Sequence, residues 1–524
     1  MSGQVPVANA LSDIYPAAAL AQQGPRWNTL LSKFKDAYGH DAAFVARSPG
    51  RVNIIGEHID YSLYSVLPMA ITADAIIAVS SRPVAAGATS FKIRIANVLD
   101  DKFAKGEFEV PLDQASEIDS TKFEWTNYFK SGLNGALELL RKKNPELKAV
   151  DMDIMMDGTV PVGGGLSSSA AFVSASALAV LYANGIASVD KRELTELAIV
   201  SERAVGVNSG GMDQSASVLS EEGSALYVSF SPSLDAKPIK FPQTSPELCF
   251  IIAQSFITSN KQVTGPIHYN LRVVEVTLAA AYLNAVLNPP GVELPKDAGS
   301  LGHSLQGFHQ TYFYHNTASD LSAPKSLTKE QELEKLIALT KETLTKEDGY
   351  TREEVAAVLN TTVADLEQRF MSKFPVRADK FKLRQRALHV FTEALRVLHF
   401  LTLLQQPMDA GATDTSDFNQ RLGALMNQTQ DSCRDLYECS CPEIDTICSV
   451  ARAAGAYGSR LTGAGWGGCS VHLVPVDKAA AVKEALEKEY YSKMTLTDDQ
   501  KEQAVVISRP ARGSALYLTE NGVN

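Results

Sequence analysis

One stretch constrains the fold of this chain more than any other. Three glycines, Gly163 to Gly165, precede three serines, Ser167 to Ser169, and an apolar run over 170–183. Glycine lets the backbone adopt positive φ and lets a ligand approach closely, and serine is a favoured N-cap. Gly185 stands where a C-cap glycine is expected. The stretch predicts a loop that opens a buried helix, whose free N–H groups suit an anion, above all phosphate. The alternative is a plain Gly/Ser connector.

The two commonest nucleotide-binding patterns do not fit this sequence. Gly463, Gly465 and Gly468 satisfy G-x-G-x-x-G, but a strand over 470–474 is predicted to follow, where a dinucleotide fold requires a helix. The Walker pattern and the protein-kinase signatures H-R-D and D-F-G are absent from the sequence. Two glycine-rich loops without these signatures imply a different nucleotide cradle.

A second charged segment lies at 47–61, which we interpret as loop-like after a short strand at 44–46. Arg51 offers a rigid fork of donors. Glu57, His58 and Asp60 offer acceptors that suit a polyhydroxylated ligand. A surface turn with an exposed ion pair is the alternative, but the apolar residues at 52, 54 and 55 should hold these charges close to a core.

Length and charge exclude several classes of protein. A chain of 524 residues is expected to form at least two domains. The net charge of −11 argues against general nucleic-acid binding and against an anionic membrane surface. The sequence has no uncharged apolar run long enough to span a membrane and no secretory pattern at its start, so we expect a cytoplasmic protein. The six cysteines lack zinc-site spacing and are expected to be reduced.

Hydrophobic periodicity gives a coarse map of the remaining chain. Residues 1–40 are interpreted as a polar, weakly helical lead-in and 288–325 as loop-rich. Strands are predicted over 66–79, 91–112, 226–228 and 248–252. Helices are predicted over 123–142, 191–205, 269–287, 328–347, 351–372 and 376–404, with another through Met426.

Three motifs together resemble the GHMP kinase superfamily. Residues 161–171 resemble its phosphate loop, 49–61 the sugar signature of its galactokinase branch, and 461–468 its third motif. Residues 432–445 are similar to the eukaryotic, fungal-type galactokinase and N-acetylgalactosamine kinase branch. The resemblance implies a two-domain α+β fold. An N-terminal domain like the second domain of ribosomal protein S5 would span 41–235, after an extension over 1–40. A C-terminal α+β domain would span 236–524, with extra helices at about 290–375.

The same resemblance implies transfer of the ATP γ-phosphate to the 1-hydroxyl of galactose, with Mg²⁺. Arg51 and Asp213 would be the catalytic pair. The sugar would also be held by Glu57, His58, Asp60, Gly210 and Tyr269. ATP would be bound by Gly163, Gly164, Gly165, Leu166, Ser167, Ser168, Ser169 and Ala170, with Trp125 and Tyr128 bordering the adenine. The metal ion would be served by Ser168, Ser169 and Glu202.

Two features of the sequence modify the mechanism that the resemblance implies. The phosphate loop contains no lysine, so the helix N-terminus must neutralise more of the phosphate charge. A guanidinium at Arg51 makes a neighbouring carboxylate a weaker base. We therefore expect Asp213 mainly to orient the sugar hydroxyl and to take its proton late in the transfer.

Three alternative functions remain open on the sequence alone. An N-acetylgalactosamine kinase shares nearly all these motifs, although that branch tends to have Phe where this chain has Tyr269. A fungal galactose sensor that binds a transcriptional repressor is the second, but known sensors can carry a shortened serine loop and this loop is intact. The third is a non-catalytic structural or nucleotide-binding module.

Overall fold

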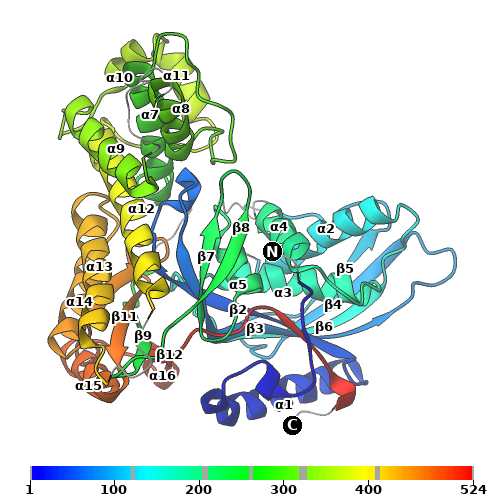
Figure 1. The fold of residues 1–524 in the computed structure, drawn as a ribbon. Helices are drawn as coiled ribbons and strands as arrows, with labels where there is room; N and C mark the ends of the chain where they lie inside the picture. The colour runs from blue at the N-terminus through cyan, green and yellow to red at the C-terminus, as the bar shows by residue number, and fades with distance from the viewer. Residues whose placement is uncertain are drawn as a thin grey trace.

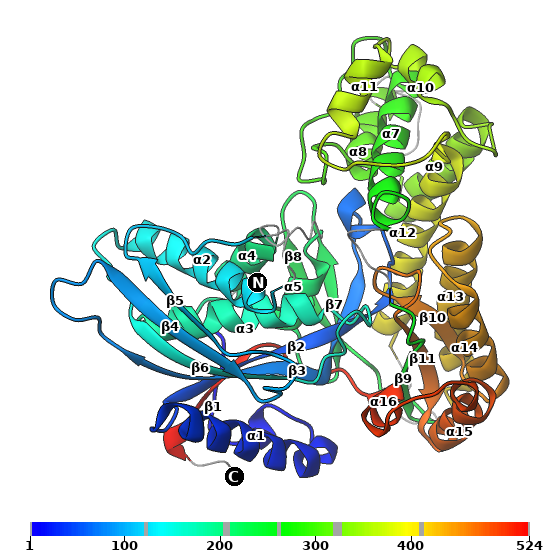
Figure 2. The ribbon, with the colours of Figure 1, turned by 180° about the vertical axis from the view of Figure 1, so that it is seen from behind.

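The computed structural model describes residues 3–119, 124–202, 210–258, 264–317, 327–407 and 413–521. Two bodies lie side by side (Figures 1 and 2). One is built on a large sheet flanked by helices, and the other on a smaller sheet with a tall stack of helices. The long helix α12 (Leu383–Gln405) lies in the middle of the second body, between the upper helices and α13.

Within the described ranges, the first body contains a seven-stranded sheet with the order β1-β13-β2-β3-β6-β4-β5. Its strands are β1 (Val7–Ala8), β2 (Phe44–Ile55), β3 (Leu67–Arg82), β4 (Ser90–Asn97), β5 (Gly106–Pro111), β6 (Asp151–Gly158) and β13 (Ala515–Leu518). Helix α1 (Ala17–Tyr38) covers one face (Figures 1 and 2). The other face carries α2 (Thr126–Lys143), α3 (Ser168–Ala183), α4 (Lys191–Glu202) and α5 (Met212–Leu219).

The start of the chain is part of this body rather than a lead-in. Trp27, Leu30 and Phe34 of α1 are fully buried against the sheet, so the apolar residues of 1–40 form a packed face that the interpretation as a polar lead-in missed. The end of the chain also returns to this sheet, because β13 pairs with β2 in antiparallel register. This pairing departs from the expected division, which assigned all of 236–524 to the second domain.

The second body is organised around a four-stranded sheet with the order β10-β11-β9-β12 in the described residues. Its strands are β9 (Leu248–Gln254), β10 (Gly458–Thr462), β11 (Cys469–Pro475) and β12 (Val505–Ser508). Helices α13 (Ser416–Asp435), α14 (Pro442–Ala453), α15 (Ala479–Glu489) and α16 (Asp498–Ala504) lie around this sheet. A hairpin of β7 (Ser224–Ser229) and β8 (Asp235–Lys240) lies between the two larger sheets in the chain order.

The helices at the far end of α12 differ in part from the sequence prediction. They are α7 (Tyr269–Leu287), α8 (Leu305–Thr317), α9 (Lys329–Thr343), α10 (Arg352–Val358) and α11 (Val363–Phe370). The loop-rich reading of 288–325 was wrong for α8, whose Phe308 is buried in the core. The single helix expected over 351–372 is two helices, because Thr362 caps a new helix with its side chain.

Two described helices, α7 and α12, are long and apolar enough to be candidate membrane spans. However, 67% and 61% of their apolar windows are buried inside the protein. The helices pack against one another and, with α9, against the rest of the helical stack. This burial is what the core helices of a folded domain show.

Candidate active site

Arg51 lies on a strand, not on the loop expected from the sequence. Strand β2 continues to Ile55, every one of its residues is buried, and it pairs with β3 through two irregularities at Pro49/Arg51 and Asn53/Ile55. Buried apolar side chains lie between the charged and polar residues of β2. They keep the segment in the sheet despite Pro49 and Gly50. The turn begins at Gly56, which adopts a φ of 102°.

Arg51 joins two predicted parts of the site. Its Nε and Nη2 atoms lie 2.8 and 2.7 Å from Oδ1 of Asp213, at the start of α5. Its Nη1 atom donates to the carbonyl oxygen of Gly165 in the glycine loop, at 2.7 Å. The side chain of Arg51 is 5% exposed and that of Asp213 is 19% exposed. A single guanidinium therefore links the proposed sugar end of the site to the proposed phosphate end.

The glycine–serine loop has the backbone geometry that its sequence predicted. Gly163 and Gly165 adopt φ values of 75° and 73°, and α3 begins at Ser168. Ser167 is the N-cap, but it is left-handed and its side chain makes no capping hydrogen bond. The expected serine cap is thus absent at Ser167. At the other end of α3, Gly185 follows the C-cap residue with a φ of 92°. The N-terminal N–H groups of α3 are therefore not satisfied by Ser167 and suit an anion.

The third glycine motif is the turn of a hairpin that packs on this loop. β10 and β11 pair in antiparallel register on either side of it. A Cβ at Gly463 would collide with the carbonyl oxygen of Gly165, and one at Gly468 would lie 3.1 Å from that of Gly164. Two backbones approach closely only because these positions lack side chains. The hairpin confirms that this G-x-G-x-x-G pattern does not open a helix.

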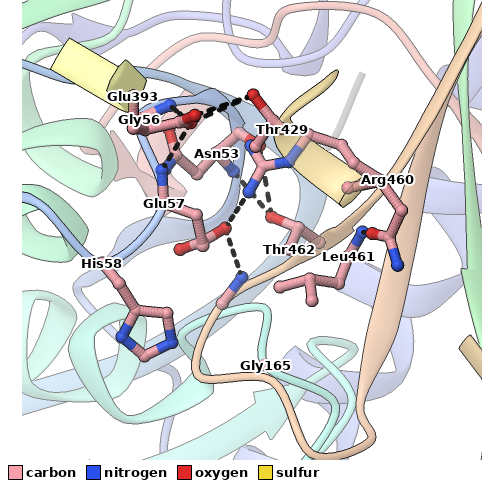
Figure 3. Close-up of polar contacts among 12 residues, drawn as sticks. Asn53, Gly56, Glu57, His58, Gly165, Glu393, Thr429, Arg460, Leu461 and Thr462 are labelled. Carbon is pink, nitrogen blue, oxygen red and sulfur yellow. Dashed lines mark hydrogen bonds and ion pairs between the residues drawn. The ribbon is translucent and has the colours of Figure 1, made fainter. Parts of the chain in front are cut away.

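Glu57 is buried and is held by groups from the second body (Figure 3). Its Oε2 atom forms an ion pair with the fully buried Arg460 of β10 and accepts a hydrogen bond from the N–H of Gly463, at 3.0 Å. Arg460 also donates to the carbonyl oxygen of Asn53, at 2.8 Å. Sequence reasoning missed Arg460, which stands in the strand just before the third motif. Its charge in a buried strand was the available signal.

His58 lies among aromatic side chains from both bodies. It adopts a φ of 61°, and its ring nitrogens lie 3.0 Å from the hydroxyl of Tyr61 and 2.9 Å from the carbonyl oxygen of Ala464. The hydroxyls of Tyr61 and Tyr437 are 2.6 Å apart. The ring of Tyr269, at the start of α7, is centred 5.8 Å from that of His58. The structure therefore brings Tyr269 to His58, and it adds Tyr437, which the sequence did not single out.

Asp60 and Gly210 lie against each other. A Cβ on Gly210 would collide with the Asp60 carboxylate, so this position has no room for a side chain. Asp60 is 7% exposed. Burial, reinforced by the nearby charge of Asp213, raises the pKa of Asp60 to about 6. Hydrogen bonds from the hydroxyl groups of a ligand would stabilise the charged form of this carboxyl group.

The residues expected to serve the metal ion and the adenine lie on the helices around α3. Glu202 ends α4, is fully buried and accepts a hydrogen bond from the side-chain amide of Gln214. The ring of Trp125 stacks on Phe172 of α3, with centroids 6.1 Å apart, and Tyr128 lies at 6.3 Å from the same ring. Burial, followed by the charge of Glu202, raises the pKa of Tyr128.

No cluster of three or more His, Cys, Asp or Glu side chains able to hold a metal occurs in the part of the chain that the structure describes. All six cysteines, which lie in described ranges, are free. Residues 203–209, which include the end of the helix predicted over 191–205, lie outside the described residues.

Comparison with known proteins shows to which family this chain belongs. Residues 32–81 match the galactokinase galactose-binding signature, 127–221 the GHMP kinases N terminal domain and 416–493 the GHMP kinases C terminal domain. The galactokinase of Saccharomyces cerevisiae is 44% identical over 95% of this chain and 95% of its own length. This chain belongs to the galactokinase family. The galactokinase of Schizosaccharomyces pombe is 40% identical over 94% of this chain and 95% of its own length.

A solved member of the galactokinase family has the same fold. The crystal structure of Lactococcus lactis galactokinase complexed with galactose superposes with a TM-score of 0.62, covering 93% of this chain and 99% of that chain at 22% identity. The predicted two-domain α+β fold is therefore confirmed. As a member of the galactokinase family with both GHMP kinase domains, the chain is an ATP-dependent sugar kinase.

Proposed function

We propose that this chain transfers the γ-phosphate of ATP to the 1-hydroxyl of D-galactose, giving galactose 1-phosphate. The observation that carries the proposal is the contact of Arg51 with both Asp213 and the carbonyl oxygen of Gly165. This contact supports the proposal because it joins the carboxylate that we assign to the sugar to the loop that we assign to the phosphates. The galactose-binding signature over 32–81 and the galactokinase relatives support galactose as the acceptor.

In the proposed reaction, Asp213 acts on the attacking hydroxyl. Arg51 contacts Oδ1 through two nitrogens, and we assign Oδ2 to the sugar hydroxyl. The hydroxyl oxygen forms a bond to the γ-phosphorus, the bond to the β–γ bridging oxygen breaks, and the hydroxyl proton passes to Asp213 late in the transfer. Arg51 and the N-terminus of α3 stabilise the negative charge on the transferred group, since the loop has no lysine.

We assign the remaining sugar contacts to the turn after β2 and its neighbours. Asp60 and His58 would accept from or donate to ring hydroxyls, and Gly210, without a side chain, would let its backbone lie directly against Asp60. Burial raises the pKa of Tyr269 well above its ordinary value, so the phenol stays protonated and can donate. Glu57 would contribute less directly than the sequence suggests, because Arg460 already binds one of its carboxylate oxygens.

The residues around the start of α3 fit a magnesium ion bound with ATP. Mg²⁺ prefers oxygen ligands and is usually held by one or two carboxylates together with substrate phosphates. Ser168 and Ser169 supply hydroxyls, and Glu202 supplies a fully buried carboxylate whose Oε2 already accepts from Gln214. When bound, the ion would neutralise phosphate charge. In this chain Ser168 and Ser169 would hold it at the helix end, and Gln214 would orient Glu202 toward it.

The adenine would lie near Trp125 and Tyr128, whose rings flank Phe172 on the helix that begins at the phosphate loop. We place the reaction in the cytoplasm, in keeping with the negative charge and free cysteines of the chain.

A sugar-panel kinase assay tests this function. ADP release is measured with galactose, N-acetylgalactosamine, glucose and mannose for the wild type and for Asp213→Ala. The proposal expects turnover on galactose that exceeds turnover on the other sugars and that falls at least 100-fold in Asp213→Ala. Folded wild-type protein that phosphorylates N-acetylgalactosamine faster, or no hexose at all, would overturn it.

A further inference from the structure

Two side chains of helix α12, which lie one helical turn apart, form hydrogen bonds with the turn after β2. Glu393 is fully buried, and its Oε1 atom accepts hydrogen bonds from the N–H groups of Gly56 at 2.8 Å and Glu57 at 3.2 Å (Figure 3). His389, also fully buried, has its Nε2 atom 3.0 Å from the carbonyl oxygen of Glu57. Since a carbonyl only accepts, Nε2 carries the hydrogen and donates it.

Further contacts keep Glu393 and His389 in the protonation states that these hydrogen bonds require. The second oxygen of Glu393 accepts from Arg396 at 2.8 Å and from the hydroxyl of Thr429 at 2.9 Å. Burial alone raises the pKa of Glu393, but Arg396 and the other positive groups nearby lower it to about 2. Burial lowers the pKa of His389 to about 3, and its Nδ1 atom accepts from the hydroxyl of Ser432 at 2.8 Å. At neutral pH the pair is therefore an anion and a neutral imidazole.

The turn held in this way is not a conformation that the local sequence favours. Gly56 adopts a φ of 102°, where a Cβ would lie 3.0 Å from Val66 and 3.1 Å from Val397. His58 is left-handed at a φ of 61°, which costs a non-glycine residue about 1 kcal/mol or more. Such a conformation persists only where its surroundings impose it.

Glu57, between these two positive-φ positions, is held at every polar group by the second body. Its N–H bonds to Glu393, its carbonyl oxygen to His389, and its carboxylate to Arg460 and the N–H of Gly463. The residues that follow, His58 and Asp60, are the ones assigned to the sugar.

We infer that His389 and Glu393 are positioning residues that hold the 56–58 turn, and with it His58 and Asp60, in the shape that receives the hexose. This inference rests on the proposed function for the identity of the sugar. Neither side chain needs to touch substrate, because each acts through the backbone of Gly56 and Glu57. The same helix packs against α7 and α9, so it connects the sugar turn to the helices at the far end of the second body.

The experiment compares Glu393→Ala and Glu393→Gln with a matched control on the same helix, Leu404→Ala. Leu404 is 5% exposed and stands three helical turns away from Glu393, so its truncation destabilises the helix core without freeing the turn. Glu393→Ala is expected to raise the KM for galactose at least 10-fold and the KM for ATP less than 3-fold. Glu393→Gln keeps an acceptor oxygen and is expected to fall between Glu393→Ala and the wild type. It also serves as the test if Glu393→Ala does not fold.

Hydrogen exchange provides a readout that does not depend on activity. Amides in the peptide covering 54–62 are expected to exchange at least 10-fold faster in both Glu393 variants than in the wild type and in Leu404→Ala. Equal exchange in the variants and the control, or a rise in both KM values by the same factor, would overturn the inference. A wild type that phosphorylates no hexose would instead refute the proposed function, and the exchange result would still decide the role of Glu393.

Discussion

Arg51 and Asp213 stand 162 positions apart in the sequence, yet two guanidinium nitrogens of Arg51 lie within 2.8 Å of one carboxylate oxygen of Asp213. The strand β2 supplies the first residue and the short helix α5 the second. These two contacts hold the Oδ1 atom of Asp213 in place beside Arg51. Fixed geometry of this kind is what a phosphoryl transfer requires from the protein.

Replacing the Asp213 carboxylate with an amide should slow the reaction far more than it weakens sugar binding. Asp213→Asn keeps the shape of the side chain but cannot accept the hydroxyl proton, so kcat should fall about 10²- to 10⁴-fold. The Kd for galactose, measured by calorimetry, should change less than 10-fold. The exposed Asp36 of α1 provides the control Asp36→Asn, which should keep normal turnover. Near-normal turnover in Asp213→Asn would exclude any role for the carboxylate.

The close approach of the two glycine loops predicts different outcomes for two glycines with the same backbone conformation. Gly463 and Gly185 have φ values of 90° and 92°, but a Cβ at Gly463 collides with the Gly165 carbonyl, whereas nothing lies within 4 Å at Gly185. Gly185→Ala should cost about 1 kcal/mol of unfolding free energy and leave the KM for ATP unchanged. Gly463→Ala should cost more and raise the KM for ATP at least 10-fold. Equal effects of the two substitutions on stability and KM would contradict this packing.

The raised pKa of Asp60 predicts a pH-dependent cost in stability without substrate. Burial and the charge of Asp213 raise this pKa to about 6, so the folded protein holds a proton that the unfolded chain loses near pH 4. The contribution of Asp60 to stability therefore falls as pH rises from about 4 to about 6, by about 3 kcal/mol in total. In urea unfolding, the stability of Asp60→Asn relative to the wild type should rise as pH increases from about 4 to about 6. A stability difference that does not vary between pH 4.5 and pH 7.5 would refute it.

The buried pair of Glu57 and Arg460 should behave as a coupled unit. Arg460→Met leaves the Glu57 carboxylate buried without its cation, which should cost about 3–5 kcal/mol of unfolding free energy. The double variant Glu57→Gln/Arg460→Met removes both charges and should recover much of that loss. The double-mutant cycle is measured by urea unfolding at pH 7.5. If the two single losses simply added in the double variant, the pair would not be coupled.

The sequence predicted the backbone geometry of those parts of the candidate site that carry their own local signal. The glycines at 163–165 and 463–468 need positive φ or close backbone approach, and this need is visible in the chain itself. Helix α7 was predicted with the bounds that the structure gives it. The strand expected over 470–474 is part of β11, whereas its hairpin partner β10 was not predicted.

The parts that sequence reasoning missed depend on contacts between distant segments. Arg460 and Glu393 stand in an ordinary strand and an ordinary helix, and only the packing of the second body brings them to Glu57. The sequence predicted a strand only for 44–46 of β2, and 47–55 was interpreted as loop-like because of its charged residues. The structure shows that this part of the strand is also buried. Helix α1 was predicted only as part of a weakly helical lead-in, and strand β13 was not predicted. Their buried faces are complete only when the two ends of the chain meet.

Selection of galactose and phosphorylation of its 1-hydroxyl are the two properties proposed for this site. Both are tested by kcat/KM for galactose and for N-acetylgalactosamine on one preparation, with the product identified by ³¹P NMR. The kcat/KM should be at least 10-fold higher for galactose, and the product should carry its phosphate on C1. An equal or higher kcat/KM for N-acetylgalactosamine, or phosphate on another carbon, would contradict this proposal.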